Sequence, residues 1–222
     1  AAHKLFPDTR LVVGHSLDYG YYYTFDADIS LTEKEIESIS AQMKELVSRN
    51  LPITTERISY EEATVLFEKL GLKETRKQLN YIGTPSIKIN TIDDFSDIYF
   101  GPLVSSTGVL KTFELLNYGD GFLLRFPNTE TPNVLTKFVD QPKLFEVYKK
   151  YKDWGKRIEV TSAASLNELI AQRKVNDFID ITETFQQKNI SKIASQIVDR
   201  GTVRVVLIAG PSSSGKTTSA KK

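Results

Sequence analysis

The sequence contains no cysteine, one methionine, one tryptophan and two histidines among its 222 residues. Without cysteine there is no disulfide bond, no thiolate metal ligand and no cysteine nucleophile, and this composition is typical of a reducing compartment. We therefore expect a cytoplasmic protein. His3 and His15 have no cluster of carboxylates around them in the sequence, so we interpret both as solvated or structural side chains rather than metal ligands.

Neither sign of charge dominates the chain. Lys and Arg number 29 against 28 for Asp and Glu, which gives a formal net charge of +1 and no global field that attracts nucleic acid. No apolar run approaches the roughly 20 residues that cross a bilayer, so we expect no membrane partner. A hydrophobic fraction of 40% with 26% charged residues is ordinary for a folded globular chain of one large domain or two smaller ones.

The most specific motif is GPSSSGKT at residues 210–217, which fits the phosphate-loop pattern G-x-x-x-x-G-K-[S/T]. Its glycines allow backbone N–H groups to approach phosphate oxygens, its lysine would reach the β and γ phosphates, and its threonine hydroxyl would coordinate Mg²⁺. The apolar run 203–209 predicts a buried parallel strand before the loop, and a helix is expected from residue 218. The pattern predicts binding of ATP and Mg²⁺; the alternative is a flexible Ser/Gly-rich tail.

Residues 205–218, VVLIAGPSSSGKTT, resemble the opening of uridine kinase and phosphoribulokinase-type enzymes. The resemblance implies ATP-dependent phosphate transfer to a hydroxyl group of a nucleoside or sugar. It implies that Lys216 is catalytic and that Thr217 holds Mg²⁺. The phosphate contacts that it implies are Gly210, Ser213, Gly215, Lys216 and Thr217. The family's later acidic residue has no position in the chain, so we expect the parent protein to be a kinase and these residues alone to be inactive.

The segment before the loop mixes helices and strands, which predicts an α+β fold. Capping boxes at Thr32 and Ser59 each precede apolar residues at helical spacing, and further helices are expected after Pro142, from Ser165 and over 175–200. The predicted strands are 11–13, 21–25, 53–58, 87–89, 112–118 and 122–126. The last two strands are expected to form a hairpin through the turn YGDG at 118–121.

The N-terminal part resembles the editing domain, or second additional domain, of threonyl-tRNA synthetases, which is shared with alanyl-tRNA synthetases. Three landmarks occur in order: AAH at 1–3, the strand GHSLDYGYYYTF at 14–25, and DIYFGPLVSSTG at 97–108. The resemblance implies hydrolysis of mischarged tRNA at a site of histidines and a cysteine. Here Tyr99 replaces the family's cysteine, Leu103 replaces its second-motif histidine, and only His3 remains of the first pair. We therefore predict an editing site that has lost its chemistry.

These patterns divide the chain into three parts. Residues 1–155 are expected to form the editing-like α+β domain, 156–201 a helical connector, and 202–222 the start of an α/β P-loop kinase domain that the chain contains only in part. The leading functional hypothesis is an ATP-dependent, uridine-kinase-like phosphotransferase. The alternative is a binding module for nucleic acid, derived from an editing domain without its hydrolase activity, that recognises the acceptor end of tRNA.

Two sequence features bear on that alternative. The tyrosines at 19 and 21–23 could stack on bases, although an aromatic strand is more often part of a core. The basic residues between 149 and 157 could touch RNA phosphates, but the acidic residues among them favour a solvated helix face.

The acidic residues at 93, 94 and 97 are interpreted as turn residues rather than catalytic carboxylates.

Overall fold

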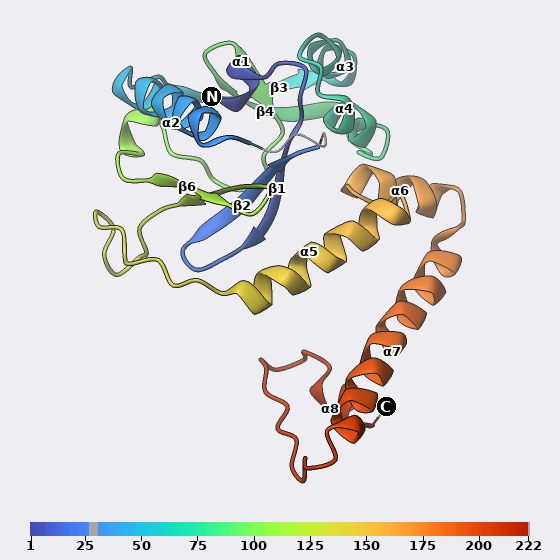
Figure 1. The fold of residues 1–222 in the computed structure, drawn as a ribbon. Helices are drawn as coiled ribbons and strands as arrows, with labels where there is room; N and C mark the ends of the chain where they lie inside the picture. Colours follow the sequence, from blue (N-terminus) through green and yellow to red (C-terminus); the bar gives the residue numbers. More distant parts are fainter. Residues whose placement is uncertain (27–30, 222) are drawn as a thin grey trace. The chain divides into compact units, whose positions relative to one another are not determined.

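The structure is a computed structural model that describes residues 1–26 and 31–221. The chain divides into two compact units, Ala1–Ser165 and Leu166–Lys222, which are described separately. The first unit is a mixed structure of helices and two antiparallel sheets, as the predicted α+β class requires (Figure 1). This arrangement is consistent with an editing-like domain.

The larger sheet has four antiparallel strands in the order β1-β2-β7-β6. The strands are β1 (Leu11–Ser16), β2 (Gly20–Phe25), β6 (Glu114–Tyr118) and β7 (Gly121–Arg125). The predicted hairpin of β6 and β7 is confirmed: Tyr118 pairs with Gly121, and Gly119 takes the positive φ of 57° that the tight turn needs. A side chain at Gly121 would collide with the Tyr23 carbonyl oxygen, so glycine lets β7 approach β2.

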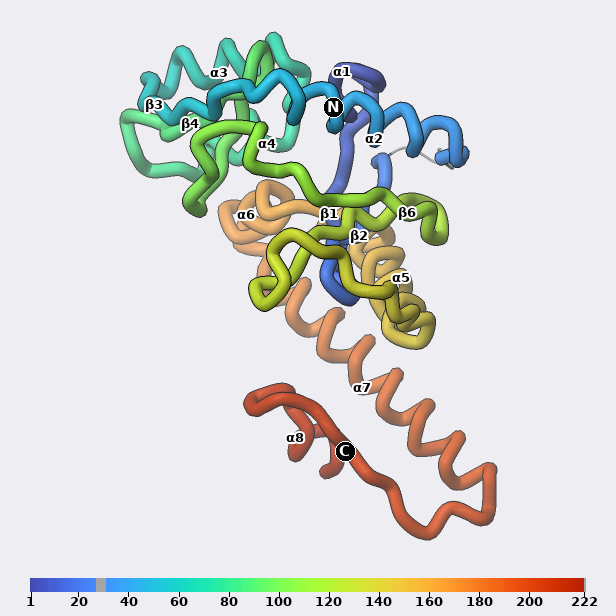
Figure 2. The backbone as a smooth tube through the Cα atoms, turned by 90° about the vertical axis from the view of Figure 1, so that its left-hand side faces the viewer, coloured from blue at the N-terminus to red at the C-terminus, as the bar shows by residue number. Residues whose placement is uncertain are grey.

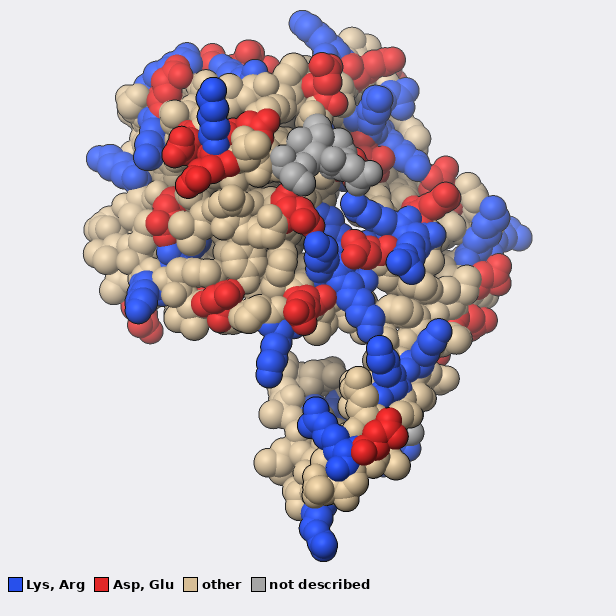
Figure 3. Space-filling model, viewed as in Figure 1, with Lys and Arg blue, Asp and Glu red and all other residues tan. Residues whose placement is uncertain are grey.

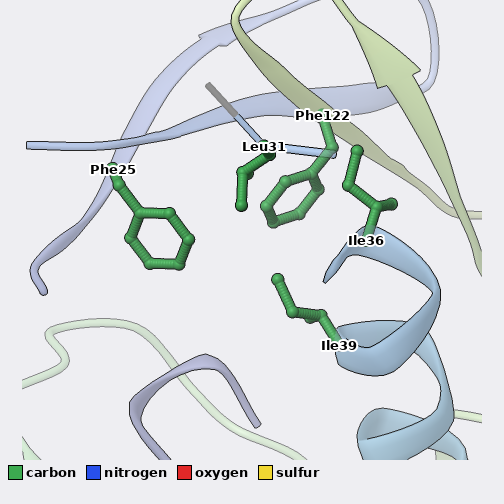
Figure 4. Packing of buried hydrophobic residues seen from close by; sticks show 5 residues of the cluster. All are labelled: Phe25, Leu31, Ile36, Ile39 and Phe122. Atoms are coloured by element: carbon green, nitrogen blue, oxygen red, sulfur yellow. The ribbon is translucent and has the colours of Figure 1, made fainter. Parts of the chain in front are cut away.

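Helices cover both faces of this sheet because side chains alternate along β2. Phe25 points to one face, where it packs with Leu31, Phe122 and the buried isoleucines of α2 (Glu33–Ser48) (Figure 4). On the opposite face Tyr22 and Leu123 pack with Leu17 against aromatic side chains of α5 (Pro142–Arg157). The two helices predicted from the capping box at Thr32 and from Pro142 thus cover the sheet from opposite sides.

The smaller sheet has three antiparallel strands in the order β3-β4-β5. Its strands are β3 (Ile53–Ser59), β4 (Ser86–Ile92) and β5 (Phe95–Asp97). Two helices, α3 (Tyr60–Lys69) and α4 (Lys73–Leu79), pack against it. The buried residues of this second core are Ala63, Phe67, Leu79, Ile87 and Ile89. Helix α4 and strand β5 are short and carried too weak a periodic pattern to be predicted.

Both predicted capping boxes are confirmed. The Thr32 hydroxyl accepts from the Glu35 backbone N–H while the Glu35 carboxylate accepts from the Thr32 N–H, and Ser59 and Glu62 repeat the arrangement. Backbone donation by Ser59 is the main reason that the pKa of Glu62 lies below its ordinary value. These local bonds explain why both helix starts could be predicted from sequence.

We expect Ser59→Ala to lower the free energy of unfolding by about 1 kcal/mol at neutral pH, because one N-terminal donor of α3 loses its acceptor. The folded-state pKa of Glu62 is depressed, so the contribution of its carboxylate is present above the unfolded pKa and is lost as pH falls through the folded pKa. Urea titrations at pH 7 and pH 3 measure both effects. An equal Ser59→Ala effect at the two values would show that Glu62 is not part of the cap.

The start of α6 (Ala163–Ala171) differs from its prediction. Helix α6 begins before Ser165, because Ser162 and not Ser165 precedes the first turn: the Ser162 hydroxyl accepts from the Ser165 N–H at 3.1 Å, and the Ser165 hydroxyl accepts from the Ser162 N–H at 3.0 Å. Serine replaces the usual glutamate in this reciprocal cap, so the sequence pattern pointed to the wrong residue. The remaining helical segments of the first unit are α1 (Ala2–Leu5) and a 3₁₀ turn (Thr107–Val109).

The second unit is dominated by α7 (Val175–Asp199), which confirms the long helix predicted there, and ends with α8 (Lys216–Lys221). The prediction of a buried strand at 203–209 is wrong: the tube in Figure 2 has neither strand nor helix between α7 and α8, and Leu207 is 90% exposed. A strand needs a hydrogen-bonding neighbour, and the described residues after 165 contain no strand to pair with it. No described helix is long and apolar enough to cross a membrane.

Candidate functional site

The loop that follows β5 is fixed by a buried asparagine. Asn90 lies on β4, where its side-chain oxygen accepts from the Thr55 hydroxyl at 2.8 Å and its amide nitrogen donates to the Tyr99 carbonyl oxygen at 3.4 Å. The backbone at the position of the family's cysteine is therefore tied to the centre of the three-stranded sheet. The Tyr99 side chain itself is 52% exposed.

Asp97 supports the same loop from inside. Its carboxylate accepts from the Thr75 hydroxyl at 3.1 Å and from the Ile98 backbone N–H at 2.8 Å. Burial raises the pKa of Asp97, and these two donors oppose the rise. The contacts join α4 to the loop through Asp97, which is the last residue of β5 and not the turn residue that the sequence predicted.

Four aromatic side chains lie near one another, and we call this group the aromatic face: Tyr21, Tyr23, Tyr99 and Phe126. The Tyr21 and Phe126 rings are 5.7 Å apart between centroids. Burial raises the pKa of Tyr23, and the phenols of Tyr21 and then Tyr99 raise it further, which places both of these groups within electrostatic range of the Tyr23 hydroxyl. Three of the four side chains are exposed, which leaves their rings available to a ligand.

The exposure of Tyr21 depends on its place along β2: it shares a face with Phe25, but the core cluster under α2 includes Phe25 and Tyr23 and not Tyr21. The sequence-based preference for a core role is confirmed for Tyr22, which is 7% exposed, but is wrong for Tyr21, which is 44% exposed. The two residues are adjacent in a strand, so their side chains leave the sheet on opposite faces. Neither aromatic content nor a period-2 pattern could distinguish them, because both faces of β2 carry buried side chains, Tyr22 on one and Phe25 on the other.

The three positions of the predicted degenerate editing site all lie in the first unit. His3 lies on α1 with its ring centroid 5.1 Å from that of Phe95, Tyr99 belongs to the aromatic face, and Leu103 is exposed in the loop after β5. A phenol and an isobutyl group provide neither the thiolate nor the imidazole of the family motif. Within residues 1–26 and 31–221, no group of three or more His, Cys, Asp or Glu side chains is arranged to hold a metal ion.

The predicted phosphate loop lies in the second unit. Gly215 has a φ of 77° and Ser213 a φ of 60°, and the Lys216 ammonium group donates to the Gly210 and Pro211 carbonyl oxygens at 2.9 and 2.5 Å. Helix α8 begins at Lys216, two residues before the predicted start. The ammonium group of Lys216 is thus bound to carbonyl groups of the loop itself, whereas the sequence-based prediction has Gly210, Ser213, Gly215, Lys216 and Thr217 holding phosphate and Thr217 holding Mg²⁺. Binding of ATP and Mg²⁺ remains a prediction.

Basic side chains gather on the surface over α5 (Figure 3). The sequence predicted a solvated helix face for this run, and Lys150 and Arg157 are indeed exposed. Lys152 differs, because it is partly buried between α5 and β2, where its ammonium group contacts the Thr24 hydroxyl. Linear charge patterning does not reveal this contact, since the two residues are 128 positions apart.

Comparison with known proteins shows similarity to threonine–tRNA ligases over about half of the chain. The chain is 34% identical over 122 residues to the threonine–tRNA ligase of Maridesulfovibrio salexigens, a match of 55% of this chain and 19% of that ligase. It is 38% identical over 117 residues to that of Acidithiobacillus ferrooxidans, a match of 52% and 18%. The chain spans about a fifth of the length of the curated relatives it matches. No family model matches it.

These matches confirm the resemblance to a region of threonyl-tRNA synthetases and overturn the prediction that the parent protein is a uridine-kinase-like kinase, because the relatives are ligases. A nucleoside or sugar substrate has no support either. The error has a physical cause: a phosphate-loop pattern such as that at 210–217 predicts contacts to phosphate but does not specify a reaction. Similarity over more than a hundred residues carries more information than this short motif.

Proposed function

We propose that the first unit, residues 1–165, is a tRNA-binding module that recognises the single-stranded acceptor end and does not hydrolyse the bond to an attached amino acid. The observation that carries the proposal is the similarity of half the chain to threonine–tRNA ligases, proteins whose name states that they act on tRNA. The replacements at Tyr99 and Leu103 support the non-hydrolytic part of the proposal, because neither side chain offers a thiolate or an imidazole.

The aromatic face supports recognition of unpaired nucleotides. Proteins bind single-stranded RNA by stacking its bases on aromatic rings, and each such stack contributes about 1–3 kcal/mol. Tyr21 and Tyr99 present exposed rings, and Tyr99 occupies a position to which the resemblance assigns editing chemistry. Replacement of the cysteine by tyrosine thus exchanges a reactive group for a stacking surface.

We expect the full chain to bind tRNA with an affinity that falls as salt concentration rises, and Tyr21→Ala or Tyr99→Ala to weaken binding by about 5- to 150-fold through loss of one stack. Fluorescence anisotropy with intact tRNA measures this, and a tRNA that lacks its last three nucleotides is expected to bind more weakly. Tyr151→Ala is the matched control, because this tyrosine is equally exposed, at 44%, but lies on α5 outside the aromatic face.

Two results would contradict the proposal. Equal affinity for intact and trimmed tRNA, with no effect of the aromatic-face variants, would remove recognition of the acceptor end. Release of the amino acid from mischarged tRNA faster than in buffer would show that hydrolysis persists. In that case Tyr99→Phe would test whether the phenol hydroxyl takes part.

A further inference from the structure

A cavity of about 210 Å³ lies between α5 and the four-stranded sheet, on the opposite face of β2 from the aromatic face. Its floor includes Tyr22 and Thr24 of β2, and its wall includes Phe145 and Tyr148 of α5. The cavity lies wholly within the first unit. Its volume is below the roughly 300–1,000 Å³ of sites for drug-sized ligands, so it suits a small molecule.

Five charged residues line the cavity: Asp120, Lys149, Lys152, Asp153 and Lys156. The Lys149 ammonium group is neutralised by the Asp120 carboxylate at 2.6 Å. Among the described residues, neither Lys152 nor Lys156 forms an ion pair within 4.0 Å, although each carries a positive charge toward the cavity. The two lysines are one helical turn apart, which places them on the same face of α5.

The position of Lys152 is unfavourable without a ligand. Burial lowers its pKa, and the like charge of Lys156 lowers it further, whereas the carboxylates of Asp26, Asp153 and Asp120 raise it. An anion between the two ammonium groups would offset both unfavourable contributions. After the Asp120–Lys149 pair, Lys152, Lys156 and Asp153 leave the lining with a net charge of +1, which attracts a phosphate anion whose oxygens accept hydrogen bonds from ammonium and hydroxyl groups.

His15 adds to the cavity lining a neutral hydrogen-bond donor whose ring is held by stacking. Its ring stacks on Tyr148 with a centroid separation of 3.9 Å and an interplanar angle of 15°. Burial, followed by the charge of Lys152, lowers the pKa of His15, so at neutral pH its imidazole offers one N–H and one acceptor nitrogen. The apolar rings beside it provide a surface for the organic part of an ester.

We propose that this cavity is a binding site for a small phosphate-bearing ligand, either inorganic phosphate or a compact phosphomonoester, held by the ammonium groups of Lys152 and Lys156. This inference does not rest on tRNA binding, since the cavity and the aromatic face lie on opposite faces of the sheet. The phosphate would enter as a ligand and undergo no reaction.

Isothermal titration of the full chain with inorganic phosphate, ribose 5-phosphate and acetate tests the proposal. We expect both phosphates to bind, acetate to bind at least tenfold more weakly, and Lys152→Met or Lys156→Met to weaken phosphate binding at least about tenfold through loss of one charge-assisted contact. Tighter binding of ribose 5-phosphate than of inorganic phosphate would identify an ester as the ligand; the reverse would identify the free ion.

Lys143→Met is the matched control, because it removes the same charge from the same helix outside the cavity. If Lys152→Met fails to fold, Lys156→Met alone tests the phosphate site. Lys156 is exposed, and its replacement leaves the contact between Lys152 and Thr24 intact. Unchanged phosphate affinity in Lys156→Met, or the same loss in Lys143→Met, would overturn the proposal. The tRNA affinity of the same variants is measured separately, so that failure of the phosphate-site proposal can be distinguished from failure of the tRNA-binding proposal.

Discussion

Arg125→Met is expected to lower the free energy of unfolding by about 3–5 kcal/mol. Arg125 lies on β7 and is only 3% exposed, so its charge depends entirely on protein partners. Its guanidinium group pairs with the Glu114 carboxylate, approaches the Asp18 carboxylate to 3.6 Å and donates to the Thr136 carbonyl oxygen at 2.5 Å. The group thus connects the β1–β2 turn, strand β6 and the segment before α5.

The cost arises mainly from what Arg125→Met leaves behind. Asp18 is largely buried, and one of its carboxylate oxygens has no hydrogen-bond partner in the structure. Without the guanidinium group this carboxylate would be an uncompensated buried charge, whereas Glu114 is exposed enough to be solvated. Phe138, whose ring centroid is 5.3 Å from the guanidinium carbon, would also lose a cation–π contact.

Urea unfolding monitored by the fluorescence of Trp154, the single tryptophan, reports on the first unit. The double variant Arg125→Met with Asp18→Asn is the informative control. It should recover part of the loss, because the carboxylate no longer carries a charge. A loss below 1 kcal/mol in Arg125→Met, or no recovery in the double variant, would show that the pairing contributes little.

Phe67→Ala is expected to cost about 3–5 kcal/mol, the range observed when a large aromatic side chain is removed from a core. Phe67 is fully buried on α3 and packs with Leu79 of α4 and the inward-facing Ile87 and Ile89 of β4. Its removal leaves a cavity that two short helices and one sheet cannot close without losing their own contacts. Phe67→Leu retains most of the volume and is expected to cost about 1–2 kcal/mol.

The Phe67→Ala effect should be centred on the three-stranded sheet. Amide hydrogen exchange is expected to accelerate most in β3 and β4, and less in β7 of the other sheet. Because Asn90 of β4 holds the backbone of Tyr99, the variant should also weaken tRNA binding. Uniform acceleration across both sheets would show that the two cores unfold as one unit, and unchanged exchange would contradict the packing argument.

The elements that sequence predicts well are those set by local bonds. Each capping box joins residues three positions apart, and the hairpin of β6 and β7 depends on one turn containing Gly119, so both are visible in short stretches of sequence. The segment 203–209 failed for the complementary reason. Its apolar residues fit a buried strand, but a strand is defined by its neighbours and not by its own composition.

The candidate sites were predicted unevenly. The positions of the lost cysteine and histidine, Tyr99 and Leu103, followed from motif order alone, because a replaced side chain is visible without coordinates. The exposed rings of the aromatic face did not follow, since Phe126 and Tyr99 join Tyr21 only after two sheets have formed. The kinase prediction failed because a short phosphate-binding pattern does not specify a reaction class.

By itself the sequence determined the absence of thiol chemistry, the α+β class, the main helices and the resemblance to a synthetase region. Only the tertiary structure decided which charges are buried and which rings are open to a ligand. Arg125 and Lys152 are ordinary basic residues in the sequence, and their environments come from partners distant in the chain: Thr24 contacts Lys152 across 128 positions. Local patterns specify bonds within a few residues, whereas burial and electrostatics depend on the packing of distant segments.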